Sequence, residues 1–283
     1  MKSTWMIVAG LLFGLMGVCV KLGSAYFSSA ELVFYRSLIG LVVIFGIVRV
    51  QGLSLATPHV ASHLWRGLSG FLALMLFFYA LSALPLATAI TLNYTAPLFL
   101  SLLLTFWLKE HVHWRLISAI LVGFVGVILL LRPSLHAAQI KAGLMGLTSG
   151  FLASFAYLNV KQLGAMGEPE WRVVFYFTLF STIGAGAWML IHQFHALSWK
   201  TLPILIGLGT TATLAQLAMT RAYRLGKTLV VASFAYTTVI FASLFGILLW
   251  DEWLSPMSWL GIALIVTSGV LSTFWQPKIK LPN

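Results

Sequence analysis

The chain has 283 residues, of which 60% are apolar and only 8% carry a charge, and its formal net charge is +11. A soluble domain is typically about 45–50% apolar and about 25% charged, so a soluble core of this size could not bury so much apolar surface. The composition excludes a water-soluble enzyme, and the single cysteine excludes a secreted scaffold held by disulfides. The chain is therefore expected to be an integral membrane protein.

Long, continuous apolar runs fill most of the sequence and predict membrane-spanning helices. A spanning helix needs about 20 mostly apolar residues, whereas the strands of a membrane barrel would alternate apolar with polar residues. In chain order we expect ten spans, at residues 4–21, 30–49, 64–82, 86–107, 115–131, 142–163, 172–192, 202–221, 228–249 and 257–275. The connecting loops are then too short to hold a soluble domain.

The basic residues predict the orientation of these spans, because lysine and arginine accumulate on the cytoplasmic side of membrane proteins. If the N-terminus is cytoplasmic, twelve basic residues, Arg66 among them, lie at inner loops or inner span ends, and only four lie at outer ones. We therefore expect both termini in the cytoplasm, in a bacterial inner membrane or an organelle membrane. The same distribution accounts for the net charge and argues against nucleic-acid binding, since no basic cluster forms a patch.

The two halves of the chain match each other when the sequence is shifted by about 141 residues. Identical residues recur in the same order at shifts of 140 to 142: Gly10 and Gly150, Lys21 and Lys161, Tyr94 and Tyr236, and Glu110 and Glu252. We expect a first repeat at residues 1–137 and a second at residues 138–283. Because each repeat holds five spans, an odd number, the second enters the membrane from the opposite side. Inverted repeats are typical of secondary transporters, with the substrate site near the midplane between them.

Over essentially its whole length the chain resembles the EamA family of the drug/metabolite transporter superfamily. The resemblance rests on the two five-span halves, on Arg36 at the end of the motif Glu-Leu-Val-Phe-Tyr-Arg, and on Tyr94 and Pro97 in a fourth-span pattern that runs on to Glu110. It implies a carrier without ATP hydrolysis, usually an exporter of amino acids or related metabolites. It also implies a cavity among spans 1–4 and 6–9, with spans 5 and 10 peripheral. Val239 stands opposite Pro97 in the second half, so a kink in span 4 need not recur in span 9.

Arg36 is the polar residue that most needs an explanation. It lies six residues into the second expected span, about 9 Å along a helix, and a guanidinium inside the bilayer costs at least ~2.5–3.5 kcal/mol unless it is paired or solvated. One interpretation is that its planar fork binds a carboxylate or phosphate of the substrate. The other is a structural role, in which it holds backbone carbonyls or Glu31 and fixes span 2 against its neighbours. The sequence leaves both open.

No acidic residue is expected near the middle of the membrane. Five of the six acids lie in loops or at span ends, and Glu31 lies at the outer end of span 2. This distribution argues against a drug–proton antiporter that binds cation and proton in turn on a central carboxylate. Proton coupling through Glu31 stays open.

Aromatic and amide side chains form the second candidate set. Tyr94 and Ser101 share one face of span 4, and Tyr236 and Ser243 share the matching face of span 9, as a pathway between two inverted halves requires. The expected substrate-binding residues are Arg36, Tyr79, Asn93, Tyr94, Ser101, Tyr157, Tyr176, Gln216 and Tyr236. Each tyrosine or amide can instead bond a neighbouring helix, and methionine, phenylalanine and leucine are expected to form most of the cavity wall.

These patterns favour a secondary carrier of small zwitterionic or anionic metabolites, amino acids first, that exports its substrate by alternating access. An exporter of hydrophobic amines or drugs is the alternative. A membrane-embedded enzyme is a remote one, because no nucleophile, base and oxyanion donor recur at a common depth. We expect no cofactor, no metal site and no catalytic residue. The substrate, the coupling ion and the choice between monomer and homodimer are left open.

Overall fold

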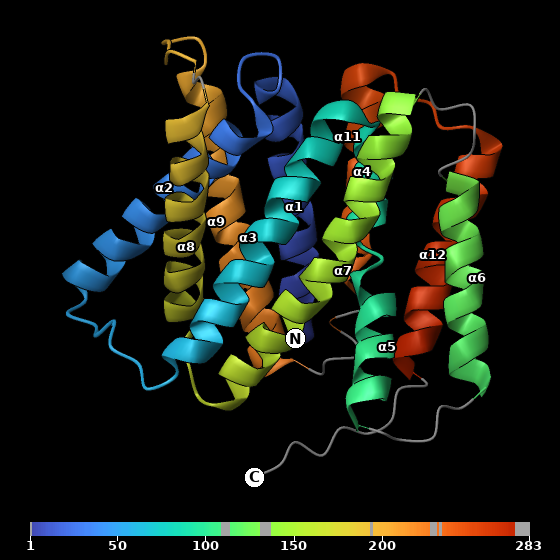
Figure 1. The fold of residues 1–283 in the computed structure, drawn as a ribbon, viewed down its shortest axis with the longest axis horizontal. Helices are drawn as coiled ribbons and strands as arrows, with labels where there is room; N and C mark the ends of the chain where they lie inside the picture. Colours follow the sequence, from blue (N-terminus) through green and yellow to red (C-terminus); the bar gives the residue numbers. More distant parts are fainter. Residues whose placement is uncertain are drawn as a thin grey trace.

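The computed structural model describes residues 2–108, 114–130, 137–192, 195–226, 231 and 234–274, and within these ranges it is helical, with no strand (Figure 1). This confirms the expected all-α class. After the short 3₁₀ helix η1 (Lys2–Thr4), the helices are α1 (Trp5–Gly23), α2 (Ser29–Val50), α3 (Val60–Ala83), α4 (Leu86–Asn93), α5 (Ala96–Leu108), α6 (Trp114–Leu130), α7 (Ala137–Ala165), α8 (Glu170–Ile191), α9 (Leu202–Leu225), α11 (Thr237–Trp250) and α12 (Pro256–Phe274).

Six of the described helices, α1, α2, α3, α7, α8 and α9, are long and apolar enough to cross a membrane. The stretch Leu86–Leu100 and the helices α11 and α12 are apolar but shorter. The count of ten spans and the cytoplasmic position of both termini stay predictions. Part of the expected ninth span, at residues 228–230, 232 and 233, lies outside the described residues.

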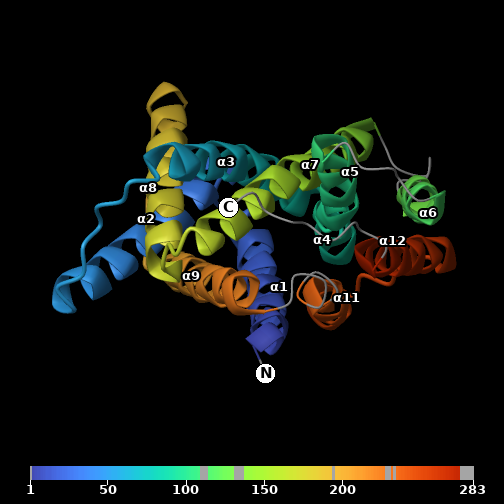
Figure 2. The same ribbon diagram turned by 90° about the horizontal axis from the view of Figure 1, so that it is seen from below.

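The helices pack in pairs that join the two expected halves of the chain. α1 packs on α9, α3 on α7, α2 on α8, α4 on α11, and α6 on α12. The α6–α12 pair lies at one end of the bundle and the α2–α8 pair at the other, with the remaining helices between them (Figure 1, Figure 2). Helices α6 and α12 correspond to expected spans 5 and 10, for which the family resemblance implied a peripheral position.

The fourth expected span, residues 86–107, is not one continuous helix. Helix α4 ends and α5 begins on either side of a turn at Tyr94 and Thr95. Pro97 explains the position of this turn, because proline has no backbone N–H to donate to the carbonyl four residues earlier, at Asn93. Hydropathy does not reveal the interruption, since the apolar run continues through it.

A threonine and a glycine stabilise this turn between α4 and α5. Thr95 Oγ1 donates to the carbonyl oxygen of Leu92 at 2.7 Å, and the Thr95 backbone N–H donates to the same oxygen at 3.2 Å. Both bonds go to a carbonyl in the last turn of α4, where an interrupted helix leaves backbone acceptors without their usual partners. Gly150 of α7 packs directly against the turn: a Cβ added there would lie 2.6 Å from Thr95 Oγ1 and 2.8 Å from the Leu92 carbonyl oxygen. Only glycine lets α7 approach the interruption this closely.

A matching turn precedes α11. Tyr236 lies in this turn, directly before Thr237, and Thr237 Oγ1 donates to the carbonyl of Phe234 at 2.7 Å. Gly10 of α1 packs against it, with Thr237 Oγ1 2.7 Å from where a Cβ would lie. No kink was expected here from the sequence, because Val239 replaces the proline of the first half. The turn nevertheless forms, with a threonine hydroxyl bonded to a backbone carbonyl three residues earlier, as in the first half.

The start of α2 accounts for Glu31. Ser28 and Glu31 form a capping box, in which the Ser28 backbone N–H donates to Glu31 Oε2 at 2.7 Å. The backbone N–H of His195, in the loop after α8, donates to Glu31 Oε1 at 2.5 Å. Glu31 is completely buried, so its carboxylate caps a helix and holds a loop at one end of the bundle, away from the central cavity.

Candidate functional site

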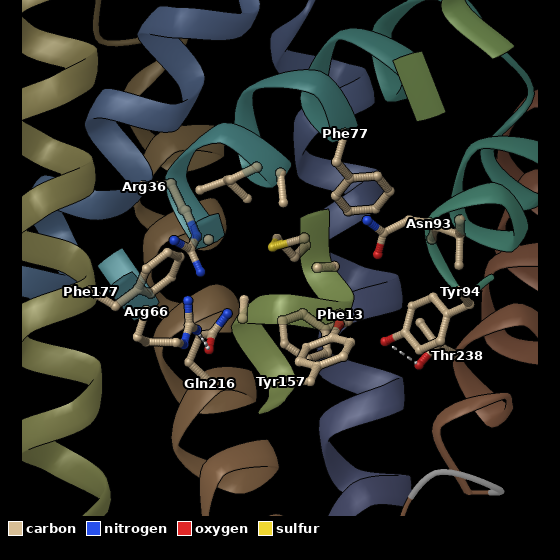
Figure 3. A pocket seen from close by; sticks show the side chains of 17 residues that line it. Phe13, Arg36, Arg66, Phe77, Asn93, Tyr94, Tyr157, Phe177, Gln216 and Thr238 are labelled. Carbon is tan, nitrogen blue, oxygen red and sulfur yellow. Dashed lines mark hydrogen bonds between the residues drawn. The ribbon is translucent and has the colours of Figure 1, made fainter. Parts of the chain in front are cut away.

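A cavity of about 60 Å³ lies in the middle of the bundle (Figure 3). Side chains from α1, α2, α3, α4, α7, α8, α9 and α11 line it, together with the turn between α4 and α5. This is the position among spans 1–4 and 6–9 that the family resemblance implied. No acidic side chain is among the described residues that line it.

Arg36 of α2 points into this cavity (Figure 3). The residue is only 2% exposed, and its Nε and Nη1 atoms have no hydrogen-bond partner among the described residues. Its guanidinium carbon lies 5.1 Å from the centre of the Phe177 ring on α8. The carboxylate of Glu31 is bonded to Ser28 and His195 instead, so the ion pair between Glu31 and Arg36 is not formed. Donor atoms that are buried and unpartnered are what a binding role for Arg36 requires.

Arg66 of α3 is a second buried arginine on the same side of the cavity (Figure 3). It is 3% exposed, its guanidinium carbon lies 4.1 Å from the Phe177 ring centre, and its Nη2 donates to Gln216 Oε1 at 3.4 Å. Its Nε and Nη1 have no partner within the described chain. From the sequence, Arg66 was expected at an inner span end and not in the binding site. Helix α3 begins at Val60, four residues before the expected start, so Arg66 lies in its second turn.

The two guanidinium groups concentrate positive charge on one side of the cavity. Their central carbons are at most about 9 Å apart, because they lie 5.1 and 4.1 Å from one ring centre. At an effective dielectric constant of about 20 they repel each other by at least roughly 2 kcal/mol, and each costs at least ~2.5–3.5 kcal/mol to hold inside a membrane. A cation–π contact returns roughly 0.5–2 kcal/mol. The ring of Phe177 therefore offsets only part of this cost, and an anion would offset the rest.

Gly70 leaves the space that the Arg66 side chain occupies. A Cβ added to Gly70, one turn further along α3, would overlap Nη1 of Arg66 and would lie 2.9 Å from Cε2 of Phe177. Since Nη1 is the far end of a flexible side chain, the guanidinium would move rather than the backbone. Gly70 therefore determines where the Arg66 charge lies.

The opposite side of the cavity is polar but uncharged (Figure 3). The hydroxyl of Tyr94, in the turn between α4 and α5, accepts a hydrogen bond from Thr238 Oγ1 of α11 at 2.9 Å. Asn93 Nδ2 donates to Ser149 Oγ of α7 at 3.0 Å. The turn between α4 and α5 is thus held to α11 and α7, helices that belong to the other expected half.

Aromatic side chains complete the wall of the cavity. Phe13 comes from α1, Phe77 from α3 and Tyr157 from α7. Tyr157 stacks on Tyr223 of α9, with ring centres 5.9 Å apart and an angle of 22° between the rings. A bound molecule would therefore meet two cations on one side and aromatic and amide groups on the other.

Five of the residues expected to bind substrate line the cavity: Arg36, Asn93, Tyr94, Tyr157 and Gln216. They come from four different parts of the chain, since Asn93 and Tyr94 are neighbours, and the packing of the two halves brings them together.

The other four expected residues are placed differently. Tyr176 donates to the carbonyl of Leu55 at 3.0 Å, close to the loop between α2 and α3. Tyr79 lines a separate recess of the surface. Tyr236 is 3% exposed, does not line the cavity, and has a hydroxyl without a partner among the described residues. The side chain of Ser101 lies outside the described part of the structure.

Sequence reasoning missed Arg66, Thr238 and Phe177. With the third span starting at Val60, Arg66 would lie inside the span and would be a candidate binding residue for the same reason as Arg36. Thr238 lies two residues after a tyrosine that was selected, and helical periodicity places it on a different face. Phe177 carries no signal, because an aromatic residue in an apolar span is ordinary.

One end of the bundle holds a partly buried ion pair. Glu252, which follows α11, pairs with Lys21 of α1 through Oε1, and its Oε2 accepts the backbone N–H of Leu86 at the start of α4 at 2.8 Å. The Lys21 ammonium also lies 5.0 Å from the ring centre of Trp250. This cluster ties α1, α4 and α11 together.

A second charged cluster lies where the loop between α2 and α3 meets the loop between α7 and α8. Glu168 accepts hydrogen bonds from Thr57 and from Arg172 Nη1, the latter at 3.0 Å, and lies 3.5 Å from His63 Nε2. Burial by itself would raise the pKa of Glu168. The hydrogen bonds from Thr57 and Arg172, with the positive charge of Arg172 and the neighbouring His63, outweigh burial and lower this pKa below its ordinary value.

No three histidine, cysteine, aspartate or glutamate side chains in the described ranges gather closely enough to hold a metal ion. The arrangement of the cavity instead suits reversible binding of a small molecule between two sets of helices.

Comparison with known proteins agrees with this arrangement. The profile of the EamA-like transporter family matches residues 2–132 and again residues 140–274. The pseudopaline exporter of Pseudomonas aeruginosa is 29% identical over 262 residues, which cover 93% of this chain and 92% of that protein. The riboflavin transporter of Vibrio cholerae is 29% identical over 283 residues, covering 98% of this chain and 94% of that protein. The S-adenosylmethionine uptake transporter of Rickettsia bellii is 23% identical over 257 residues, covering 88% and 85%.

A solved crystal structure shares the fold. It superposes with a TM-score of 0.69 over 99% of this chain and 100% of that chain, at 17% sequence identity. The two matches to the family profile together span almost the whole sequence, and the relatives are named as transporters and not as enzymes. The chain belongs to the EamA-like transporter family, and it is a multi-pass membrane protein that transports small molecules.

Proposed function

We propose that the protein is a secondary active carrier for small metabolites that bear an anionic group, and that the central cavity is its substrate site. The observation that carries this proposal is the pair Arg36 and Arg66. Both are almost fully buried, both line the cavity with unpartnered donor nitrogens, and no described acid lines it with them. A guanidinium binds a carboxylate or phosphate through two parallel hydrogen bonds, so an anionic group would satisfy these donors.

Six side chains would form the site. Arg36 and Arg66 would bind the anionic group, and the amide and hydroxyl groups opposite them would orient the remainder of the molecule. The proposed substrate-binding residues are Arg36, Arg66, Asn93, Tyr94, Tyr157 and Gln216.

Support for alternating access comes from how the two halves pack. The pairs α1–α9, α3–α7 and α2–α8 each join a helix of one expected half to a helix of the other. The turns at Tyr94 and Tyr236 each pack against a glycine of the other half, Gly150 and Gly10 respectively. Interrupted helices at the interface of inverted repeats are where secondary transporters bind substrate. We therefore take residues 1–137 and 138–283 as inverted repeats that exchange conformations.

The proposed direction is export from the cytoplasm across a bacterial inner membrane, with both termini inside. The excess of basic residues at the expected inner side supports this orientation. Of the relatives named above, one is called an exporter and one an uptake transporter, so membership of the family does not decide the direction. Transport of labelled substrate in both directions, in proteoliposomes whose protein orientation is known from protease protection, would decide it.

Counterflow in proteoliposomes tests the substrate class. Labelled carboxylates, amino acids and organic cations are each offered to the intact protein and to the variants Arg36→Gln and Arg49→Gln. Arg49 is the matched control, because it lies on the same helix as Arg36 but is exposed. We expect exchange of anions or zwitterions that falls at least about tenfold in Arg36→Gln, the loss of one charge-assisted pair, and that is retained in Arg49→Gln.

Exchange of organic cations that Arg36→Gln leaves unchanged would contradict the proposal. It would replace it with an exporter of hydrophobic amines and leave Arg36 a structural residue. Both variants are first checked by gel filtration in detergent, so that loss of folding is not mistaken for loss of transport.

A further inference from the structure

We infer that the substrate carries two negative charges at the side of the cavity where Arg36 and Arg66 lie, as a dicarboxylate or a phosphate monoester does. This inference rests on the proposed function and narrows it. A single anionic group would be enough for one arginine, and the structure provides two.

The first step of the argument is a count of charges. Two guanidinium groups, each permanently charged, line one cavity together with fifteen other residues, none of which is acidic. Of the acids described above, Glu31 belongs to a helix cap and Glu168 to a loop cluster. The protein therefore does not neutralise this side of the cavity, and a molecule enclosed there in a membrane has to supply two negative charges to do so.

The second step is a count of hydrogen-bond donors. Arg36 and Arg66 each leave Nε and Nη1 without a partner, which makes four free donor nitrogens. One carboxylate can bind one guanidinium through two parallel bonds. Nε and Nη1 of one guanidinium point in different directions, so the free donors of each arginine can donate to oxygens on two sides. Four free nitrogens on two arginines therefore provide for the oxygens of two carboxylates, or of one phosphate ester that bonds both arginines.

The third step concerns geometry. The two arginines come from α2 and α3, but both guanidinium carbons lie over the Phe177 ring, at 5.1 and 4.1 Å. That ring brings the two cations within about 9 Å of each other, so the two acidic groups of one small molecule can reach both at once. Because Gly70 has no side chain, the Arg66 guanidinium has room to lie in this position.

The fourth step disfavours a simple amino acid. Its ammonium group would add a third cation to a cavity whose described lining holds no carboxylate. The acceptors that the described lining offers are uncharged: the amide oxygens of Asn93 and Gln216 and the hydroxyls of Tyr94, Tyr157 and Thr238. Two of them are already in use, since Gln216 accepts from Arg66 and Tyr94 accepts from Thr238. An amino acid fits this site only if a second acidic group compensates for its ammonium.

Competition in the counterflow assay tests the inference with three probes of four carbons each, near neutral pH. Succinate carries two negative charges, butyrate carries one, and γ-aminobutyrate is a zwitterion. Glycerol 3-phosphate is tested beside them as a phosphate monoester, with glycerol as its uncharged control. We expect the dianions to be exchanged, or to compete, at least about tenfold better than the monoanion and the zwitterion.

Variants of Arg66 assign the preference to the arginine pair. Arg66→Gln removes one charge, so we expect the advantage of succinate over butyrate to fall at least about tenfold. Arg66→Lys keeps the charge but not the planar fork, and should retain a preference for dianions at lower affinity. Arg49→Gln, on α2 and exposed, should leave the ratio unchanged. Arg66→Gln removes both the charge and the planar fork, whereas Arg66→Lys removes the fork alone. Each variant gives its own comparison with the intact protein, so misfolding of one does not remove the test.

The outcomes are separable. Exchange of monoanions or zwitterions in preference to every dianion would overturn the inference and leave the carrier with its anion-binding arginine intact. A preference for dianions that Arg66→Gln does not change would overturn it as well. Exchange confined to organic cations, or no exchange of any compound offered, would contradict the proposed function itself.

Discussion

The hydroxyl of Thr238 donates a hydrogen bond of 2.9 Å to the hydroxyl oxygen of Tyr94. This bond joins the start of α11 to the turn between α4 and α5, across the interface of the two expected halves. At the repeat shift of 142 residues, the positions that match Tyr94 and Thr238 are Tyr236 and Ala96. Because alanine has no hydroxyl, the mirror-image bond does not exist, and Tyr236 has no partner among the described residues. The bond is thus one respect in which the two halves differ.

Removal of this hydroxyl tests its contribution to stability. Thr238→Val keeps the shape of the side chain but not the donor, so we expect a loss of about 0.5–1.5 kcal/mol, the usual net value of one hydrogen bond. Thermal unfolding in detergent measures this as a lower midpoint than that of the intact protein. Thr210→Val on α9, where the side chain is exposed, is the control. Equal midpoints for the two variants would contradict the assigned role of the bond.

Substitution of Gly70 tests the position of Arg66 without removal of its charge. A methyl group at Gly70 would overlap Nη1 of Arg66, so Gly70→Ala should displace the guanidinium and reduce counterflow at least about tenfold. The helical fold should persist, because alanine is a better helix former than glycine. Gly46→Ala on α2 is the control, since no atom lies within 4 Å of its added Cβ. Undiminished transport in Gly70→Ala would show that Arg66 need not lie over Phe177.

The side chains of Lys21 and Glu252 are expected to stabilise the fold together, so that the effects of replacing them are not additive. Each side chain is only 16–17% exposed, so Lys21→Met leaves a partly buried carboxylate with the Leu86 N–H as its remaining donor. A double-mutant cycle with Glu252→Gln should give a coupling free energy of about 1–3 kcal/mol. The more exposed pair Arg224–Glu170, at 33% and 19%, should give no more than about 1 kcal/mol. Equal coupling in the two cycles would mean that burial does not strengthen the first pair.

The pKa of Glu168 predicts a dependence of stability on pH. Since the folded protein lowers this pKa, ionised Glu168 stabilises the fold above the pKa of an unfolded glutamate, about 4.3. The stabilisation is lost as the pH falls through the lower pKa of the folded protein. Glu168→Gln should therefore unfold at a lower temperature than the intact protein at neutral pH, and the difference should shrink in acid.

A matched carboxylate isolates the effect of Glu168. Glu170→Gln removes a nearby acid that pairs with Arg224 instead, and both variants are unfolded in the same detergent across the same pH series. A difference between Glu168→Gln and the intact protein that stays constant from neutral to acid pH would show that the charge of Glu168 is not what stabilises the two loops.

Helix boundaries illustrate how far sequence reasoning carries. The expected span 172–192 and the helix α8 (Glu170–Ile191) differ by only one or two residues at each end, because an apolar run in lipid has to satisfy its backbone within one helix. The start of α3 was placed four residues late, because residues 60–63, one of them a histidine, are less apolar than the span that follows. That small error left Arg66 at a span end and outside the candidate site.

The sequence by itself determined that this is a helical membrane protein and that Arg36 lies inside a long apolar helix, and it predicted that no acid shares the middle of the membrane with it. These properties follow from composition and from position along the chain, since the cost of a charge in lipid depends on its depth. The tertiary structure alone decided that Arg36 and Arg66 meet at Phe177, and that Tyr94 lines the cavity whereas its counterpart Tyr236 does not. Such relations depend on which helices pack together and on the close approaches that single glycines permit, and neither is encoded in the pattern of apolar residues along one helix.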